Sequence, residues 1–417
     1  MAVGNPSFGG VGSQTNNSRL IQSALRSTLL MGLARLTPAM LALFSTAAAP
    51  RPSKLEYRIE DQDSRFQSAF ETVDKWIRDG AFPGATLAVG RQGAVIALKA
   101  FGRTQYAPDA PVVTADQIFD LASVTKVVGT TTAVAILYEE NKLALDAPVS
   151  RYLPEFSGTP GHDQITIRQL LTHSSGLPTP GLLYEKAANK AGILKQVYTA
   201  PLDSPPGAKF VYRDPNFMLL GEVVERVCGK PIDEFLHARV FGPLGMNSTQ
   251  YNPPPKLLDR IAPTQKMGRR LVHGQVHDEN CYVMGGVCGH AGLFSTAGDL
   301  AVYAQMILNG GSYGGKRILK AGTVDLFQQR QNIPAGSSRT LGWDTPSPGS
   351  FAGDLAASRS IMHTGFTGTS VYIDLERNAF IILLTNRVHP LRENDKIDSA
   401  RPEIHTAILR AIRQTSR

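Results

Sequence analysis

The sequence predicts an α+β fold in which an antiparallel sheet is flanked by helices and carries an inserted, mainly helical lobe. Short apolar runs typical of buried strands lie near both ends of the chain, at 85–89 and 94–100 and again at 370–373 and 380–385. Apolar residues at helical spacing fill the region between them. One sheet made from both chain ends, with the helices inserted, is the simplest packing of that order.

The first helix is expected over 55–79, where Phe66, Phe70, Val73 and Ile77 recur at helical spacing. A glycine-containing turn then joins the first two strands as a hairpin. Later helices, linked by loops rich in proline and glycine, are expected at 123–140, 167–172, 217–227, 232–240, 300–308 and 402–412.

The chain of 417 residues is longer than one hydrophobic core usually spans. We therefore expect residues 50–417 to form two lobes. An α/β lobe would combine about 55–140 with 341–417, and a helical lobe would comprise about 141–340. The active site is expected between them.

Residues 1–49 are predicted to precede the fold as an export signal. They hold three arginines and no acidic residue, followed by the apolar run 36–49, which ends in Ala47-x-Ala49. The run is too short to span a bilayer comfortably. A disordered leader and a membrane anchor are the alternatives. Export predicts a periplasmic or extracellular protein.

The composition fits a soluble globular protein, with 42% hydrophobic and 19% charged residues. The net charge of +8 comes without a basic run, so no nucleic-acid partner is expected. It allows peripheral contact with a cell envelope. Three cysteines are too few for a disulfide framework. We expect Cys228 in a core, and Cys281 and Cys288 as free buried thiols rather than a pair.

Ser123 stands three residues before Lys126, where the sequence becomes helical. Residues three apart share one face of a helix, so the ammonium of the lysine can reach the serine hydroxyl. A serine becomes nucleophilic when a neighbouring base takes its proton. Ser-x-x-Lys alone is a weak signal, because it also occurs by chance at solvated helix starts. Two motifs further along the chain strengthen it.

Tyr212 and His363 begin those motifs, Tyr-x-Asp at 212–214 and His-Thr-Gly at 363–365. A phenol can relay a proton between a serine and a leaving group. The glycine beside His363, at the expected start of a C-terminal strand, lets a substrate approach the strand edge. N–H groups at such an edge can bind a developing oxyanion. Each motif alone has a plainer interpretation, a packed tyrosine or a glycine-rich strand entry.

In this order, the three motifs resemble the serine β-lactamase-related and penicillin-binding family, which includes class C β-lactamases, DD-peptidases and related esterases. The resemblance extends over about 60–412 and implies a β-lactamase/transpeptidase-like fold and a serine hydrolase domain over 50–417. Flanking phrases support it at 170–177, 219–225, 241–246 and 385–390, and those at 276–280 and 289–297 are similar to an envelope subgroup.

The resemblance implies that Ser123 is the acylated nucleophile and that Lys126 and Tyr212 form the proton-transfer pair. His363 takes the place of a lysine in many relatives. The implied oxyanion hole consists of the backbone N–H groups of Ser123 and Phe366.

Three further positions are implied to face the substrate. Thr364 would help to hold a substrate carboxylate, and Gly365 and Phe366 would line the same strand edge. No cofactor and no metal is implied.

Asp214 and His363 depart from the family pattern. β-Lactam hydrolysis usually goes with asparagine at position 214, and an ionised aspartate only accepts hydrogen bonds. Asp214 would either hold Lys126 charged, which opposes its action as a base, or prefer a substrate with a free amine. Histidine titrates near pH ~6.5, so position 363 would carry little charge at neutral pH.

Two other sites can be imagined. Gly310-Gly-Ser312-Tyr-Gly matches a nucleophile elbow, but an expected helix precedes it where a strand is required, so we expect a loop. A metal site could combine His273, His277, Asp278 and His290; Gly274 argues against the helix that this spacing needs, and loop residues near the cleft are expected instead.

The sequence therefore predicts a serine hydrolase that forms an acyl-enzyme on an ester, an amide or a D-amino-acid peptide. Its expected partner is a small-molecule or peptidoglycan-like substrate, and the chain is expected to be a monomer. The alternative is a penicillin-binding sensor or inactive envelope scaffold that is acylated without turnover.

Overall fold

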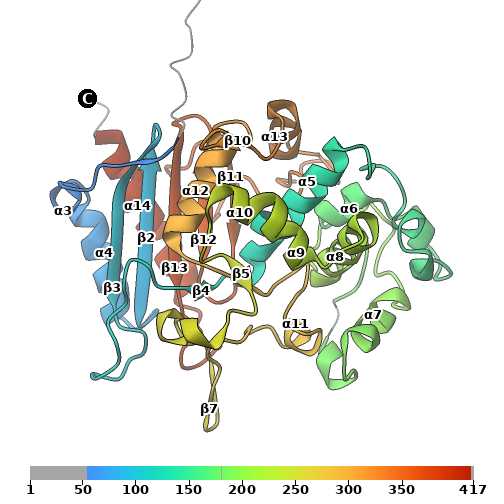
Figure 1. The fold of residues 1–417 in the computed structure, drawn as a ribbon, viewed down its shortest axis with the longest axis horizontal. Helices are drawn as coiled ribbons and strands as arrows, with labels where there is room; N and C mark the ends of the chain where they lie inside the picture. Colours follow the sequence, from blue (N-terminus) through green and yellow to red (C-terminus); the bar gives the residue numbers. More distant parts are fainter. Residues whose placement is uncertain (1–53, 180, 415–417) are drawn as a thin grey trace, which may run out of the picture. The chain divides into compact units, whose positions relative to one another are not determined.

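The computed structural model describes residues 54–179 and 181–414. Their central element is a six-stranded sheet (Figure 1). Its order is β1-β3-β2-β13-β12-β11, antiparallel except where the short β1 runs parallel to β3. The sheet joins both ends of the chain, so the predicted α+β fold is confirmed. The strands are β1 (Glu56–Tyr57), β2 (Gly84–Arg91), β3 (Ala94–Gly102), β11 (Ser360–Thr364), β12 (Ser370–Asp374) and β13 (Ala379–Thr385).

Side chains of the central strands alternate between two buried cores. Leu87 and Val89 of β2 pack on one face of the sheet with Ile381 and Leu383 of β13. Ala88, between the first two, belongs to the core on the opposite face. Because both faces are buried, these strands are continuous apolar runs in the sequence.

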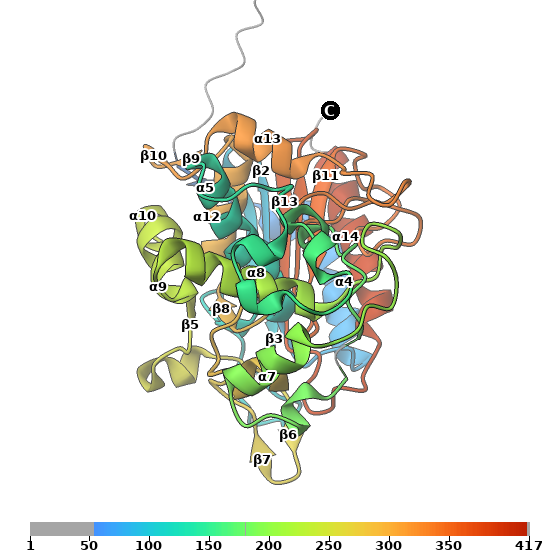
Figure 2. The same cartoon turned by 90° about the vertical axis from the view of Figure 1, so that its right-hand side faces the viewer.

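Helices cover both faces of the sheet (Figure 2). On one face lie α4 (Gln67–Arg78) and α14 (Ile397–Gln414), which pack against each other and against the strands. On the other face, α12 (Ala297–Leu308) packs against β2 and β13. Thus α12 belongs to the sheet layers, although it falls within the range 141–340.

Most other helices gather beside the sheet (Figure 1). There α5 packs against α8, α9 and α13 rather than against the strands. The α-helices besides those above are α3 (Gln62–Arg65), α5 (Thr132–Glu139), α6 (Ile167–Leu171), α7 (Lys190–Tyr198), α8 (Asp214–Cys228), α9 (Ile232–Leu236), α10 (Gly242–Leu244), α11 (Glu279–Val283) and α13 (Ala321–Gln328).

Short elements complete the fold. β4 (Phe119–Asp120), β5 (Gln250–Tyr251) and β8 (Leu293–Ser295) form a small sheet, and two hairpins are formed by β6 (Lys266–Met267) with β7 (Arg270–Leu271) and by β9 (Ser312–Tyr313) with β10 (Lys316–Arg317). The 3₁₀ and π segments are η1 (Ala122–Val124), η2 (Lys126–Thr131), η3 (Val149–Arg151), η4 (Pro154–Phe156), η5 (His162–Gln164), η6 (Leu183–Glu185), η7 (His237–Phe241) and η8 (Pro255–Arg260).

The helix predicted over 55–79 is wrong in its first part. Residues 56–57 form β1, and Glu56 N–H donates to Gly93 O while Arg58 N–H donates to Val95 O. Pairing along the edge of β3 satisfies backbone groups that an isolated helical turn at this place would leave exposed. The helical pattern begins only at Gln62.

Two local predictions also need correction. His363 lies near the end of β11, not at the start of a strand, because β11 begins at Ser360. Cys228 packs against the main core but is only half-buried, and its Sγ lies 3.3 Å from Lys230 O. Cys281 and Cys288 are free and buried, as predicted.

Residues 1–49, predicted to be an export signal, lie outside the described residues. Among the residues described, no helix combines the length and the apolar character that crossing a membrane requires. The Gly-x-Ser-x-Gly match at 310–314 follows α12 and lies in the β9–β10 hairpin, so it is not a nucleophile elbow.

Candidate active site

Ser123 lies in a strained turn between β4 and the helix that follows. Ala122 has a φ of 45°, a left-handed conformation that costs a non-glycine residue about 1–3 kcal/mol. The buried Asp120 holds this turn, because its carboxylate accepts the N–H groups of Ala122 at 2.8 Å and His277 at 2.7 Å. Burial raises the pKa of Asp120 to about 6. The turn leaves Ser123 half-buried.

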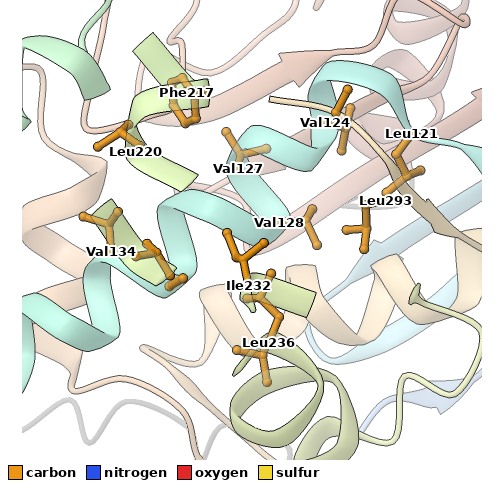
Figure 3. Packing of buried hydrophobic residues seen from close by; sticks show 14 of the residues in the cluster. Leu121, Val124, Val127, Val128, Val134, Phe217, Leu220, Ile232, Leu236 and Leu293 are labelled. Atoms are coloured by element: carbon orange, nitrogen blue, oxygen red, sulfur yellow. The ribbon is translucent and has the colours of Figure 1, made fainter. Parts of the chain in front are cut away.

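Lys126 opens the π-helical segment η2 and is fully buried. Val127 and Val128 of this segment, with Val124 of the preceding η1, pack in the apolar core among residues such as Leu293 (Figure 3). A π turn widens the helix and is frequent at functional sites. The buried helix fixes the position of the ammonium group.

The ammonium of Lys126 has three oxygen partners. Its Nζ lies 2.9 Å from Ser123 Oγ, 2.9 Å from His290 O and 2.7 Å from Asp214 Oδ1. Burial alone would lower the pKa of Lys126, but the charge of Asp214, together with Tyr212, outweighs burial and raises it. The predicted contact between the first motif's serine and lysine is present, and Asp214 holds the lysine charged.

Tyr212 lies just before α8, which begins at Asp214. Lys126 Nζ lies 5.1 Å from the centre of the Tyr212 ring, and the His363 ring lies 6.0 Å from it. The buried hydroxyl of Tyr212 lies within hydrogen-bonding reach of the Lys126 ammonium and helps to raise the pKa of that lysine. The structure therefore brings all three sequence motifs together around Ser123.

His173 completes this group and was missed as a site residue. Its ring packs 4.4 Å from the Tyr212 ring. Its Nδ1 accepts the N–H of Arg213 at 3.2 Å and lies 3.1 Å from Asn216 Nδ2, so Nε2 carries the hydrogen. Burial lowers the pKa of His173 well below its usual value, so the imidazole is neutral. The flanking phrase 170–177, quoted for the resemblance, already contained it.

His363 is buried, neutral and oriented by its own strand. Its Nδ1 lies 2.8 Å from Thr364 O, and since a carbonyl only accepts, Nδ1 carries the hydrogen. Nε2 is then an acceptor, and it has no partner among the described residues. Burial, with the charges of Arg339 and Lys126, lowers the pKa of His363 well below its usual value.

Gly365 brings the end of β11 against the serine turn. A Cβ at this position would lie 2.3 Å from Leu121 O, so only glycine allows the approach. Thr367 Oγ1 donates to Asp120 O at 2.7 Å, and Thr369 Oγ1 donates to Leu121 O at 2.9 Å. The turn after β11 and the nucleophile turn are thereby joined.

These residues open into a cavity of about 610 Å³. Among its lining residues, Arg339 is 8% exposed and has incomplete pairing. Its Nη2 lies 3.4 Å from Asp344 Oδ2, while Nε and Nη1 have no hydrogen-bond partner among the described residues. Every site residue predicted from the sequence lines this cavity except Lys126, namely Ser123, Tyr212, Asp214, His363, Thr364, Gly365 and Phe366.

The four residues considered for a metal do not converge. His290 pairs with Asp278 at 3.1 Å, His277 Nε2 lies 2.9 Å from Gln265 Oε1, and His273 Nε2 lies 2.8 Å from Ile261 O. Within the part of the chain that is described, no group of three or more histidine, cysteine or acidic residues is placed to hold a metal ion.

The family profile described as "Beta-lactamase" matches residues 66–405. The chain belongs to the β-lactamase family. Among proteins of this family, a "Putative D-alanyl-D-alanine carboxypeptidase" of Escherichia coli strain K12 is 33% identical over 397 residues, covering 84% of this chain and 91% of that protein.

Solved structures agree with the β-lactamase-family fold. The hydrolase EstCE1, which has promiscuous acyltransferase activity, superposes with a TM-score of 0.67 at 22% identity, covering 84% of this chain and 99% of its own. A penicillin-binding protein homologue from Caulobacter crescentus has a TM-score of 0.66 at 20% identity, covering 83% of this chain and 97% of its own.

Proposed function

We propose that this member of the β-lactamase family is a serine hydrolase that removes the C-terminal residue from short D-amino-acid peptides through an acyl-enzyme at Ser123. The carrying observation is the contact of Ser123 Oγ with Lys126 Nζ at 2.9 Å, on the wall of a cavity that also holds an incompletely paired arginine. The name of the relative from Escherichia coli supports the same substrate class.

In acylation, Ser123 Oγ forms a bond to the substrate carbonyl carbon, and the π electrons of the carbonyl move onto its oxygen. The proton of Ser123 passes to a base of the site and then to the leaving amine, as the C–N bond breaks and the carbonyl reforms. Water repeats the sequence in deacylation, and Ser123 regains its proton. The balance needs no redox partner and no metal.

Lys126 can act as this base only after it loses a proton of its own. As an ammonium it donates to Ser123, His290 O and Asp214. Passing one proton to Asp214 leaves a neutral amine that can accept the proton of Ser123. Tyr212, whose ring lies beside the ammonium, is placed to carry the proton on to the leaving group.

A substrate carboxylate fits the other side of the cavity. Arg339 has two unpartnered nitrogens among the described residues, and a guanidinium can bind a carboxylate through two parallel hydrogen bonds. Thr364 lines the same cavity. We propose that these two residues receive the C-terminal carboxylate of the peptide.

An ester substrate is the second candidate, favoured by the likeness to EstCE1, although an identity of 22% supports the fold alone. Asp214 makes efficient β-lactam hydrolysis less favourable than asparagine would, because an ionised aspartate only accepts hydrogen bonds whereas asparagine also donates them. A penicillin-binding sensor is the third, and slow deacylation would distinguish it from an enzyme.

Ser123→Ala tests the proposal directly. We expect the variant to fold as the wild type does, to lose hydrolysis by about 10³-fold or more, and to form no adduct with a penicillin by intact mass spectrometry. A panel of D-alanyl-D-alanine peptides, p-nitrophenyl esters and a chromogenic cephalosporin gives the substrate class. Retention of most activity would refute the role of Ser123, and adduct without turnover would support the sensor.

We propose that the protein works outside the cytoplasm, as a monomer on peptidoglycan-like material. The composition of residues 1–49 supports the export part of this proposal. A fusion of these residues to a reporter that is active only after export should be active, and an inactive fusion would contradict the proposal. Gel filtration with light scattering tests the monomer.

A further inference from the structure

The peptide that joins Gly365 to Phe366 carries a backbone N–H at the cavity. Phe366 lines the cavity, and within the described residues its N–H has no hydrogen-bond partner. In the proposed function, on which this inference rests, that N–H and the N–H of Ser123 stabilise the oxyanion. Such donors act only when they are held in the correct direction before the reaction begins.

Arg401 of α14 grips the carbonyl of this same peptide. Its Nη2 donates to Gly365 O at 2.8 Å and lies 3.2 Å from Thr369 O. Gly368 N–H also donates to Gly365 O, at 3.0 Å. The carbonyl therefore has two donors from different parts of the chain, one from a turn and one from a helix on the sheet.

A fixed carbonyl fixes the N–H on the other side of its peptide. The peptide group is planar, and in its trans form the C=O and the N–H point in opposite directions. Gly365 lacks a Cβ, so the backbone beside it rotates more freely than at any other residue type. Without the hydrogen bond from Arg401, the peptide can rotate more easily, and such a rotation turns the N–H away from the substrate.

Arg401 is buried without a close counter-ion. Arg401 is 6% exposed. The nearest acidic atom, Asp398 Oδ1, lies 3.9 Å from its Nη1 and belongs to a side chain that is 79% exposed. Burial lowers the pKa of Arg401 to about 10, so it stays charged at neutral pH. A buried cation is costly unless its hydrogen bonds are satisfied. Here backbone carbonyls of the turn bind Nη2, whereas Nε has no hydrogen-bond partner among the described residues.

We propose that Arg401 is a positioning residue for the oxyanion hole, which holds the Gly365–Phe366 peptide so that its N–H faces the reacting carbonyl. When Ser123 Oγ bonds to the substrate carbon, the carbonyl electron pair moves onto the oxygen, and the resulting oxyanion accepts a hydrogen bond from this N–H. The pair returns when the leaving group departs. Arg401 gives and takes no proton, and its positive charge behind the peptide further favours the anionic state.

Arg387 grips the neighbouring peptide and offers a comparison. Its Nε donates to Phe366 O at 2.6 Å, and its guanidinium lies 4.2 Å from the Phe366 ring centre. That carbonyl belongs to the peptide after Phe366, not to the one that carries the Phe366 N–H. Loss of Arg387 should therefore affect the ring and the substrate fit before it affects the oxyanion.

The test compares Arg401→Met with the wild type, using an ester that carries a ¹³C-labelled carbonyl. We expect kcat for acylation to fall about 10- to 1,000-fold, with KM within about threefold. Infrared difference spectra of the acyl-enzyme should show the carbonyl stretch at higher wavenumber, because it accepts weaker hydrogen bonds. A boronic acid, which mimics the oxyanion, should lose affinity in parallel.

Arg377→Met controls for lost stability, because Arg377 pairs with the buried Asp374 in the β12–β13 turn and does not line the cavity. It should lower the melting temperature and leave the carbonyl stretch unchanged. If Arg401→Met does not fold, Arg401→Lys keeps the charge and should still shift the stretch. An unchanged stretch in a folded Arg401 variant overturns the inference, whereas a wild type that forms no acyl-enzyme overturns the proposed function itself.

Discussion

Asp214 Oδ1 lies 2.7 Å from Lys126 Nζ, directly beside the hydroxyl of the predicted nucleophile. The resemblance associates β-lactam hydrolysis with asparagine at this position, where this chain has aspartate, and the difference affects the charge state of Lys126 at rest. A neutral amide would leave the buried lysine with a lowered pKa, whereas the carboxylate raises it. In the proposed mechanism, the base Lys126 is therefore held in an ion pair in the resting state.

Asp214→Asn should move the acidic limb of the kcat/KM–pH profile to lower pH. Removing the carboxylate lowers the pKa of Lys126, so the neutral amine forms at a lower pH. An opposite charge at this distance shifts a pKa by about one to three units, which sets the expected displacement. Steady-state kinetics from pH 5 to 10 with one ester and one peptide measure it.

The same substitution should shift preference toward β-lactams or peptide amides, because the amide both donates and accepts hydrogen bonds. Asp214→Glu serves as the control, since it keeps the charge and should keep the wild-type limb. A limb that stays in place in Asp214→Asn would show that Lys126 is not the group whose deprotonation limits the rate.

Tyr212→Phe should lower kcat by about 10²- to 10⁴-fold with little change in KM. The substitution keeps the ring that packs on His173 and removes only the hydroxyl beside the Lys126 ammonium, which is placed to transfer a proton. Tyr138→Phe, in α5 and away from the cavity, should leave activity unchanged. Equal kinetics for Tyr212→Phe and wild type would remove Tyr212 from the mechanism.

Arg339→Met should raise KM for peptides with a free C-terminal carboxylate by about 10- to 150-fold, the loss expected for a hydrogen bond to a charged group. Esters without a carboxylate should be hydrolysed with unchanged KM, which makes the pair of substrates its own control. If both substrates lose affinity equally, Arg339 shapes the cavity rather than recognises the carboxylate.

Thermal stability should fall as the pH is lowered from 7 to 5. His173, His277, His363 and His405 are buried, and burial lowers the pKa of each, to about 4 for His277 and about 3 for His405. Below pH ~6.5 the unfolded chain binds protons at these positions and the fold does not, so each histidine removes ~1.4 kcal/mol of stability per pH unit.

Groups with a raised pKa act in the opposite direction. Asp120, Glu222, Asp299 and His290 contribute more favourably at lower pH. They are fewer than the five buried histidines with a lowered pKa, which include His389. Scanning fluorimetry across this range gives the slope. His405→Leu, remote from Ser123, should flatten it, and an unchanged slope would contradict the assignment of His405.

The sequence predicted the parts of the site that depend on local geometry or on a resemblance. Ser123 and Lys126 are three residues apart on a helix, so their contact follows from helical spacing. Tyr212 and His363 lie far away in sequence, and only the resemblance joined them to the serine. The structure brings the three motifs to one cavity.

Arg339, Arg401 and His173 were not predicted as site residues, for a shared physical reason. Each acts through burial beside a particular carbonyl, carboxylate or ring, and neither spacing nor composition shows which arginine of a chain will be buried. The sequence failed to predict a strand where backbone pairing with a neighbouring strand outweighs the local helical pattern. The apolar residues of 55–57 suit a helix start, but the exposed edge of β3 recruits them as β1.

Asp344 and Met362 exchange two backbone hydrogen bonds, at 3.0 Å and 2.9 Å, on the outer edge of β11 just before His363. A substrate peptide that paired with this edge from Thr364 onward would meet Asp344 after one residue pair. The edge therefore suits the end of a peptide better than its middle. Within the proposed function, this favours substrates that end close to the scissile bond over substrates that continue along the strand edge.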